Sequence, residues 1–126
     1  MTVQHAVIWI DHHEARLFRL APDGAQKVKI HGGGQHFHRS QDSLGSRQER
    51  DRIYYGAIAE AMGDIPEILL LGPGLARSEF QAWLQEHQPA RCKHVLDNQA
   101  CDDVGDAALL EKWRHFFRAA DRMLPR

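Results

Sequence analysis

Residues 67–74 of this 126-residue chain read EILLLGPG, and this stretch decides the fold. Residues 68–71 form a continuous apolar run without the polar–apolar alternation of a half-buried strand. Such a run, bounded by turn residues, is typical of a strand that is buried on both faces by helices. The Gly-Pro-Gly at 72–74 then turns the chain. The stretch therefore predicts an α/β domain with this strand inside the sheet.

Three more strands are predicted before this run. They lie at residues 3–10, 14–20 and 25–31, where β-branched and aromatic residues are frequent. The connections between them are short: DHH at 11–13 and APDG at 21–24, the second with proline and glycine at positions that favour a turn. Strands joined by such short connections predict an antiparallel meander.

Helical signals follow the meander. SRQE at 46–49 is a capping box, which predicts a helix that begins at Ser46 and ends near Gly63. Further helices are predicted at 78–87 and 106–123, and a weaker strand at 92–97. The order β-β-β-α-β-α-β-α over residues 1–126 predicts one domain, with a mixed five-stranded sheet and helices on both faces.

Net charge and the distribution of apolar residues exclude some classes of function. The net charge is −1 with histidines neutral, so no whole-molecule positive field attracts nucleic acid. No apolar run approaches the ~18 residues of a membrane span, and the N-terminus lacks a secretory signal pattern. We expect a cytoplasmic protein in which Cys92 and Cys101, the two cysteines, are free thiols.

The third predicted strand runs into HGGGQHFH at 31–38, the start of a long polar segment that we call the glycine loop (residues 32–45). Two adjacent glycines, Gly33 and Gly34, let a backbone approach a ligand closely and adopt positive φ. The amide of Gln35 both donates and accepts hydrogen bonds, so it is suited to orienting a water molecule. The loop is therefore the first candidate for a functional site.

The strand order and this loop together resemble the middle domain of class I release factors from archaea and eukaryotes, which has a ribonuclease H-like fold. In that family a strand runs into a Gly-Gly-Gln loop and a charged helix follows. Here Gly33-Gly34-Gln35 stands after the third strand, Arg39 lies four residues later, and SRQERDRIYYGAIAEAM follows. A departure is Gly32, because the family usually carries arginine at this position.

The chain more closely resembles a group of small bacterial proteins in the archaeo-eukaryotic release factor superfamily, whose members are often named translational machinery proteins. The features of that group are WIDHHEARLF, GPG and FFRAADRM. They stand here at residues 9–18, 72–74 and 116–123, so the resemblance covers essentially the whole chain.

The resemblance implies a translation-associated, stand-alone domain that acts at the ribosome, with ribosomal RNA and tRNA as partners and no cofactor. Gly33, Gly34 and Gln35 would then assist hydrolysis of the peptidyl-tRNA ester or ribosome rescue, because the Gln35 amide can stabilise a developing oxyanion. Whether the protein is an enzyme stays open, since the same loop would also serve as a contact surface without catalysis.

Arginines near the loop suggest an RNA-binding surface. Arg39, Arg47, Arg50 and Arg52 would contact phosphates. The alternative is a solvated helix face in which neighbouring carboxylates neutralise them.

A histidine-loop metal-binding module is the other alternative. His31, His36 and His38 flank the glycines, and His12 and His13 lie in a turn. Imidazoles suit zinc, copper or nickel, but the spacing matches no closed zinc motif, so we expect no dedicated metal site. Asp11 is a lone carboxylate on the first strand and does not provide the acidic cluster of a ribonuclease H.

Overall fold

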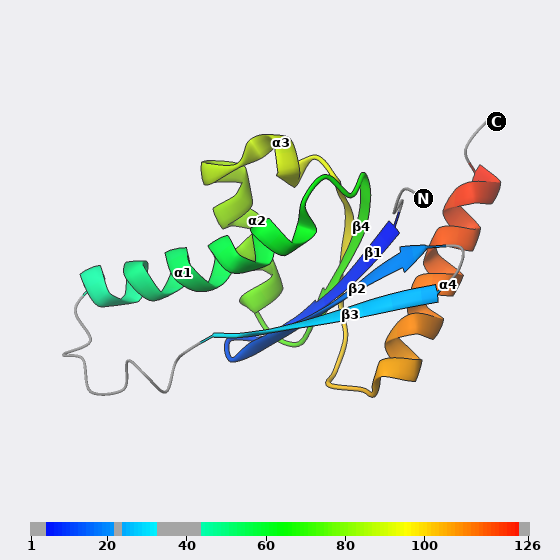
Figure 1. The fold of residues 1–126 in the computed structure, drawn as a ribbon, viewed down its shortest axis with the longest axis horizontal. Helices are drawn as coiled ribbons and strands as arrows, with labels where there is room; N and C mark the ends of the chain where they lie inside the picture. The colour runs from blue at the N-terminus through cyan, green and yellow to red at the C-terminus, as the bar shows by residue number, and fades with distance from the viewer. Residues whose placement is uncertain (1–4, 22–23, 33–43, 124–126) are drawn as a thin grey trace.

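The computed structural model describes residues 5–21, 24–32 and 44–123, with the side chains of 44–48 and 119–123 left out of the description. It contains one five-stranded sheet in the order β3-β2-β1-β4-β5 (Figure 1). The strands are β1 (His5–Ile10), β2 (Glu14–Ala21), β3 (Gly24–His31), β4 (Glu67–Gly72) and β5 (Val95–Ala100). The helices are α1 (Leu44–Met62), α2 (Ala76–His87), α3 (Pro89–Cys92) and α4 (Asp106–Met123).

Strand pairing gives the mixed sheet that the sequence predicts. β1 pairs antiparallel with β2, and β2 pairs antiparallel with β3, which confirms the meander. β4 pairs parallel with β1 on one side and with β5 on the other, so the apolar run lies inside the sheet. The predicted fold class, a ribonuclease H-like α/β domain, is thus confirmed.

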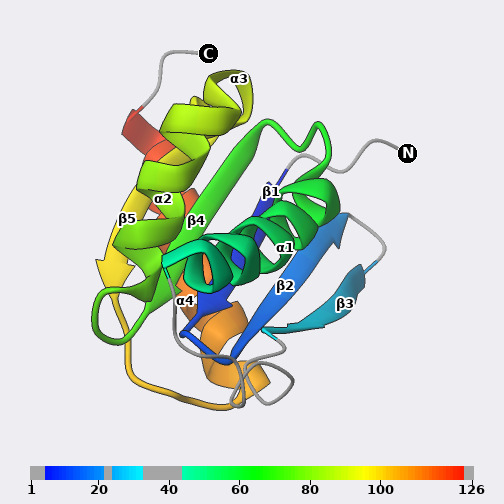
Figure 2. The same ribbon diagram turned by 90° about the vertical axis from the view of Figure 1, so that its left-hand side faces the viewer.

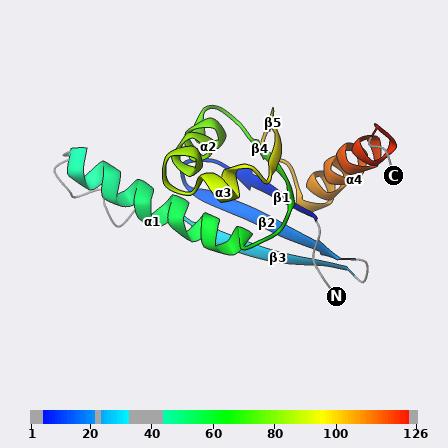
Figure 3. The ribbon, with the colours of Figure 1, turned by 90° about the horizontal axis from the view of Figure 1, so that it is seen from above.

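Helices cover both faces of this sheet. Figure 2 shows α1 and α2 in front of the strands and α4 behind them, and Figure 3 shows α1 and α4 at opposite ends of the molecule. The residues of β1 alternate between two cores: Ala6, Ile8 and Ile10 pack with the α1–α2 side, and Val7 and Trp9 pack with the α4 side. All five are buried, as expected for a central strand that helices cover on both faces.

Several boundaries differ from the sequence predictions. α1 begins at Leu44, so Ser46 lies inside the helix and the predicted capping box does not mark its start. α2 begins at Ala76, which is buried and so anchors the first turn. Of the predicted last strand, Cys92 instead ends α3, and Lys93 and His94 form a turn. Proline at the first position of α3 favours a helical turn, and this shifts β5 to Val95–Ala100.

Gly72, at the end of β4, lies against the main chain of β1. A Cβ atom at this position would stand 2.1 Å from the carbonyl oxygen of Ile10, far inside van der Waals contact. The Gly72 carbonyl accepts hydrogen bonds from the backbone N–H of Cys101 and from Nε of Arg77. The first glycine of Gly-Pro-Gly is therefore required by a close approach of two strands, not only by the turn.

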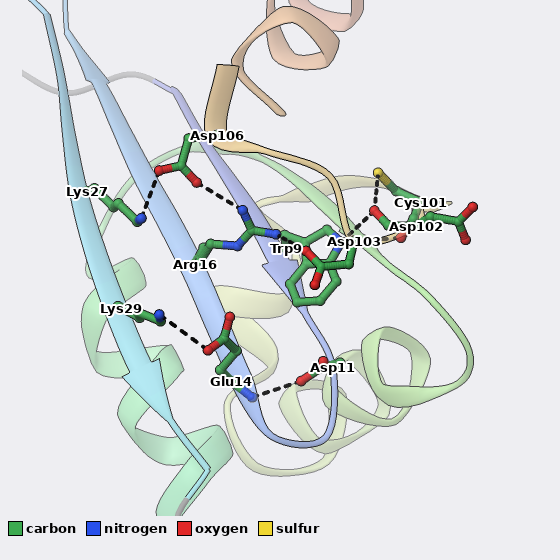
Figure 4. A network of polar contacts seen from close by, with 10 residues as sticks. All are labelled: Trp9, Asp11, Glu14, Arg16, Lys27, Lys29, Cys101, Asp102, Asp103 and Asp106. Atoms are coloured by element: carbon green, nitrogen blue, oxygen red, sulfur yellow. Dashed lines mark hydrogen bonds and ion pairs between the residues drawn. The ribbon is translucent and has the colours of Figure 1, made fainter. Parts of the chain in front are cut away.

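A polar network holds the connection between β5 and α4 to the sheet (Figure 4). Arg16 of β2 is 6% exposed, and its guanidinium lies 4.7 Å from the centre of the Trp9 ring. It donates hydrogen bonds to Asp103 at 2.8 Å and to Asp106 at 2.9 Å. Trp9 Nε1 adds a bond to the carbonyl of Cys101 at 3.2 Å. We call Trp9, Arg16, Asp103 and Asp106 the arginine clamp.

Lys27 extends the arginine clamp from β3, because its Nζ lies 2.7 Å from Asp106. The hydrogen bond from Lys27 is the largest effect on the pKa of the Asp106 carboxyl. Burial opposes it, but the hydrogen bond and charge of Arg16 add to it, so the pKa lies below its usual range. Asp106 is also the first residue of α4, where a negative charge is favourable. The clamp thus fixes where the last helix begins.

Candidate functional site at the base of the glycine loop

Gly32, the first residue of the glycine loop, is fastened to the turn between β1 and β2. Its N–H donates a 2.6 Å hydrogen bond to the carbonyl of His13. A Cβ atom at position 32 would stand 3.0 Å from the carbonyl oxygens of both His12 and His13. This crowding explains a glycine at the position where the resembled family carries arginine, because any side chain would press on two backbone oxygens.

Asp11 forms the turn against which Gly32 packs. Its Oδ1 accepts hydrogen bonds from the backbone N–H groups of His13 at 2.7 Å and Glu14 at 2.8 Å, as in an Asx-turn. The Asp11 carbonyl accepts a 2.8 Å bond from the hydroxyl of Tyr54 on α1. Burial, followed by the charge of Asp11, raises the pKa of Tyr54 far above its usual range, so the hydroxyl stays a donor. Asp11 therefore lies in the turn after β1, not on the strand as predicted, and has a structural role there.

Tyr54→Phe is expected to lower the free energy of unfolding by about 1 kcal/mol, the net value of one hydrogen bond. The ring still fills its buried site, and only the bond to the Asp11 carbonyl is lost. Urea denaturation followed by circular dichroism measures the change, and faster amide hydrogen exchange at His13 and Gly32 would locate it. Unchanged stability together with unchanged exchange would contradict this role.

A pocket of about 560 Å³ opens between α1, α2 and this turn. Its wall includes Gly32 and His12 from the loop base, Tyr54 and Tyr55 from α1, and Trp83 from α2. Tyr55 and Trp83 lie with ring centres 6.1 Å apart, and Gly56 of α1 lies beside the Trp83 ring. The start of the glycine loop therefore lies on the rim of a partly aromatic cavity.

Charged groups gather in the same pocket. His12 Nε2 lies 2.8 Å from Oε1 of Glu79, and the hydroxyl of Tyr55 lies 3.5 Å from that oxygen. Burial, followed by the negative charges of Asp51 and Glu79, raises the pKa of Tyr55 well above its usual range. Tyr55 therefore stays protonated and can donate to a carboxylate or a ligand. Arg50 and Glu86 complete the ionisable groups that the structure describes in this wall.

Only some of the functional residues predicted from the sequence lie in the part of the chain that the structure describes. Gly33, Gly34, Gln35, His36, His38 and Arg39 lie outside the described residues, as does the side chain of Arg47. Arg50 lines the pocket, whereas Arg52 is exposed and forms an ion pair with Glu49. The structure thus places Arg50 at the loop base and Arg52 on the solvent side of α1.

The histidines within the description do not form a metal centre. His31 ends β3 and is exposed, and His12 and His13 are exposed in the turn. Over residues 5–21, 24–32 and 44–123 no group of three or more His, Cys, Asp or Glu side chains is placed to hold a metal ion. Nor does any helix in these ranges have the length and apolar character needed to cross a membrane.

Sequence reasoning did not identify the α2 side of the pocket. Glu79, Ala82, Trp83 and Glu86 share one stripe of α2 through spacings of three and four residues. The sequence indicated this helix and its apolar residues, but it gave no signal that the polar stripe would face α1. That placement depends on the crossover from β4 to β5 over the same face as α1.

Known proteins were compared with the chain and its structure. No family model matches the sequence, and no curated protein matches it. The structure, however, superposes over 90% of its length on the Pelota protein of Thermoplasma acidophilum, with 21% sequence identity and a TM-score of 0.62. The fold is release-factor-like.

Two other archaeal structures give the same result. The translation termination factor aRF1 aligns over 85% of the chain, with 16% identity and a TM-score of 0.56. Pelota in a model of ribosome-bound archaeal Pelota and ABCE1 aligns over 87%, with 17% identity and a TM-score of 0.56. The chain covers 31–32% of each of the three neighbours, about a third of their length. At these identities the likeness shows the fold alone.

Proposed function

We propose that the protein is a translation-associated, stand-alone release-factor-like domain that acts at the ribosome. The observation that carries the proposal is the fold shared with Pelota and aRF1 over 85–90% of the chain. One archaeal Pelota neighbour is ribosome-bound, which makes ribosomal RNA and tRNA the natural partners to test. The position of Gly33-Gly34-Gln35 between β3 and α1 supports the same proposal.

The finer form of the proposal is that the glycine loop assists hydrolysis of the peptidyl-tRNA ester, in peptide release or ribosome rescue. Water adds to the ester carbonyl, and the tetrahedral intermediate collapses to the peptide carboxylic acid and the free ribose hydroxyl of the tRNA. Gln35 would orient the water or stabilise the oxyanion. Gly33 and Gly34 would allow the backbone to approach the ester closely.

The alternative form is ribosome contact without catalysis. It is favoured by the exposure of Arg52 and by Arg50 at the loop base, from which basic side chains can reach phosphates. Arg39 and Arg47 would belong to the same surface. The catalytic form and the contact form predict different effects of substitutions, so ribosome co-sedimentation and peptide release together distinguish them.

If the loop is catalytic, Gln35→Ala and Gly34→Val should each slow peptide release from ribosomes carrying peptidyl-tRNA at least about tenfold. Both variants should still fold and sediment with ribosomes. Gln85→Ala, on the exposed side of α2, is the control and should release peptide at the wild-type rate. The measurements are ribosome co-sedimentation and release of labelled peptide.

If the loop is a contact surface only, Arg39→Ala and Arg50→Ala should weaken co-sedimentation more than Gln35→Ala does. Circular dichroism of each variant shows that a loss of binding is not a loss of folding. Wild-type protein that neither sediments with ribosomes nor releases peptide would refute both forms and leave the likeness as one of fold alone.

A further inference from the structure

We infer that the pocket between α1 and α2 binds the side chain of an arginine from a basic protein segment. This assigns a protein-binding role to the base of the glycine loop, beyond any action of the loop at the ribosome. It does not depend on that action, because it concerns the free protein and a peptide. The charge, the aromatic surface and the size of the pocket each support it.

Charge is the first argument. Among the described residues that line the pocket, Asp51, Glu79 and Glu86 carry carboxylates, and Arg50 carries a guanidinium. His12 and Glu79 form one polar pair in this wall, with Nε2 2.8 Å from Oε1. The described part of the pocket wall therefore carries more carboxylates than basic groups, which favours a cation as the ligand.

Glu86 is the group best placed to receive that cation. Within the described part of the chain, no hydrogen bond or ion pair reaches its carboxylate, which is exposed on the pocket side of α2. An arginine can meet a carboxylate through two parallel N–H···O bonds, a geometry that lysine does not offer.

Aromatic surface and size are the second argument. Tyr55 and Trp83 line the pocket beside the carboxylates; Tyr55 is buried, so the partly exposed Trp83 is the ring on which a planar guanidinium can stack. The volume of about 560 Å³ is enough for one long side chain and part of its backbone. A hydrated metal ion would not use this aromatic surface, and no three-ligand group is found among the residues described.

An exposed leucine near the pocket indicates which kind of residue should flank the arginine in the bound segment. Leu75 lies at the start of α2, one turn before Glu79, and it is 67% exposed. It lies on the same stripe as the pocket carboxylates, because residues four apart share a helix face. An apolar side chain next to the bound arginine would cover it. The expected partner segment is therefore a short basic stretch with apolar neighbours.

The probe that we suggest is a blocked heptapeptide with a central arginine flanked by leucines. Its control replaces arginine with citrulline, which keeps the planar shape but removes the charge and replaces one NH2 donor with an acceptor oxygen. Titration into ¹⁵N-labelled protein is followed by amide shifts and by the indole N–H of Trp83, with the indoles of Trp9 and Trp113 as internal references. The arginine peptide should shift Trp83 and the pocket residues saturably, and the citrulline peptide should bind at least about threefold more weakly.

Glu86→Gln should weaken binding of the arginine peptide by about threefold and leave the citrulline peptide unaffected. Glu60→Gln is the matched control, because Glu60 lies exposed on α1 outside the pocket and should not alter binding. The inference would be overturned by the absence of a saturable shift at Trp83, or by equal binding of the two peptides. Stronger shifts of the same resonances by a short RNA oligonucleotide would also overturn it and would assign the pocket to nucleic acid.

Discussion

Gly72→Ala is expected to remove the folded state. The added Cβ would stand 2.1 Å from the Ile10 carbonyl oxygen, and neither backbone can move, because β1 and β4 are adjacent strands in the middle of the sheet. Relief requires breaking their pairing near Gly72 and moving its carbonyl away from Cys101 and Arg77. We expect a loss of about 4 kcal/mol or more, comparable with the whole stability of a small domain.

Circular dichroism and urea denaturation measure this effect, and Gly56→Ala is the matched control. Gly56 lies inside α1, and a Cβ there would stand 3.9 Å from the Trp83 ring, an ordinary contact. Alanine at this position should stabilise the protein by about 0.5–1 kcal/mol, because glycine is unfavourable within a helix. If Gly72→Ala folded with near wild-type stability, the ends of β1 and β4 could separate without loss of the fold. The prediction would then be wrong.

Arg16→Ala should lower the free energy of unfolding by about 3 kcal/mol, toward the lower end of what breaking a buried ion pair costs. The substitution removes both hydrogen bonds to the carboxylates of Asp103 and Asp106 and the packing of the guanidinium on Trp9. The cost stays near the lower end because Asp103 remains exposed to water after the change. Arg16→Met should recover part of the loss, since it keeps the apolar stem.

Lys27→Ala is the matched control for the arginine clamp. It removes a partly exposed ion pair with the same Asp106, so the loss should stay below about 1 kcal/mol. Equal effects of Lys27→Ala and Arg16→Ala would contradict the assignment of Arg16 as the buried centre of the clamp. Urea denaturation at neutral pH gives both values.

Acid titration adds an independent check on the clamp. The pKa of Asp106 is lowered in the folded state from its usual 3.8, so its stabilising contribution is present above that value and is lost as the pH falls through the folded-state pKa. The difference in stability between wild type and Arg16→Ala should therefore shrink below about pH 4. A difference that stays constant down to about pH 2 would exclude Asp106 as a partner.

The fold was largely predictable because its signals are local. The apolar run of β4, the turns of the meander and the periodic final helix each specify an element through residues that are close in sequence. The α4 boundaries, Asp106–Met123, were predicted correctly. The start of α1 was not, because a sequence such as SRQE can cap a helix or lie within its first turns.

The pocket and the arginine clamp were not predictable, because their contacts are distant in sequence. Arg16 reads as an ordinary polar residue between Ala15 and Leu17, because its partners Asp103 and Asp106 lie 87 and 90 residues away. His12 and Glu79 are separated by 67 residues and meet only when α2 packs beside the first turn. Arg50 was identified as a candidate, but Glu79 and Glu86, which line the same pocket, come from another helix.

The placement of α4 has a consequence for synthesis of the chain. The apolar side of β1 that carries Val7 and Trp9 is translated well before Leu109 and Phe117, which cover it. Until α4 has emerged from the exit tunnel, the nascent sheet must present that surface to water or to a chaperone. Ribosome pausing between β5 and α4 would therefore prolong the aggregation-prone stage of this protein's own production.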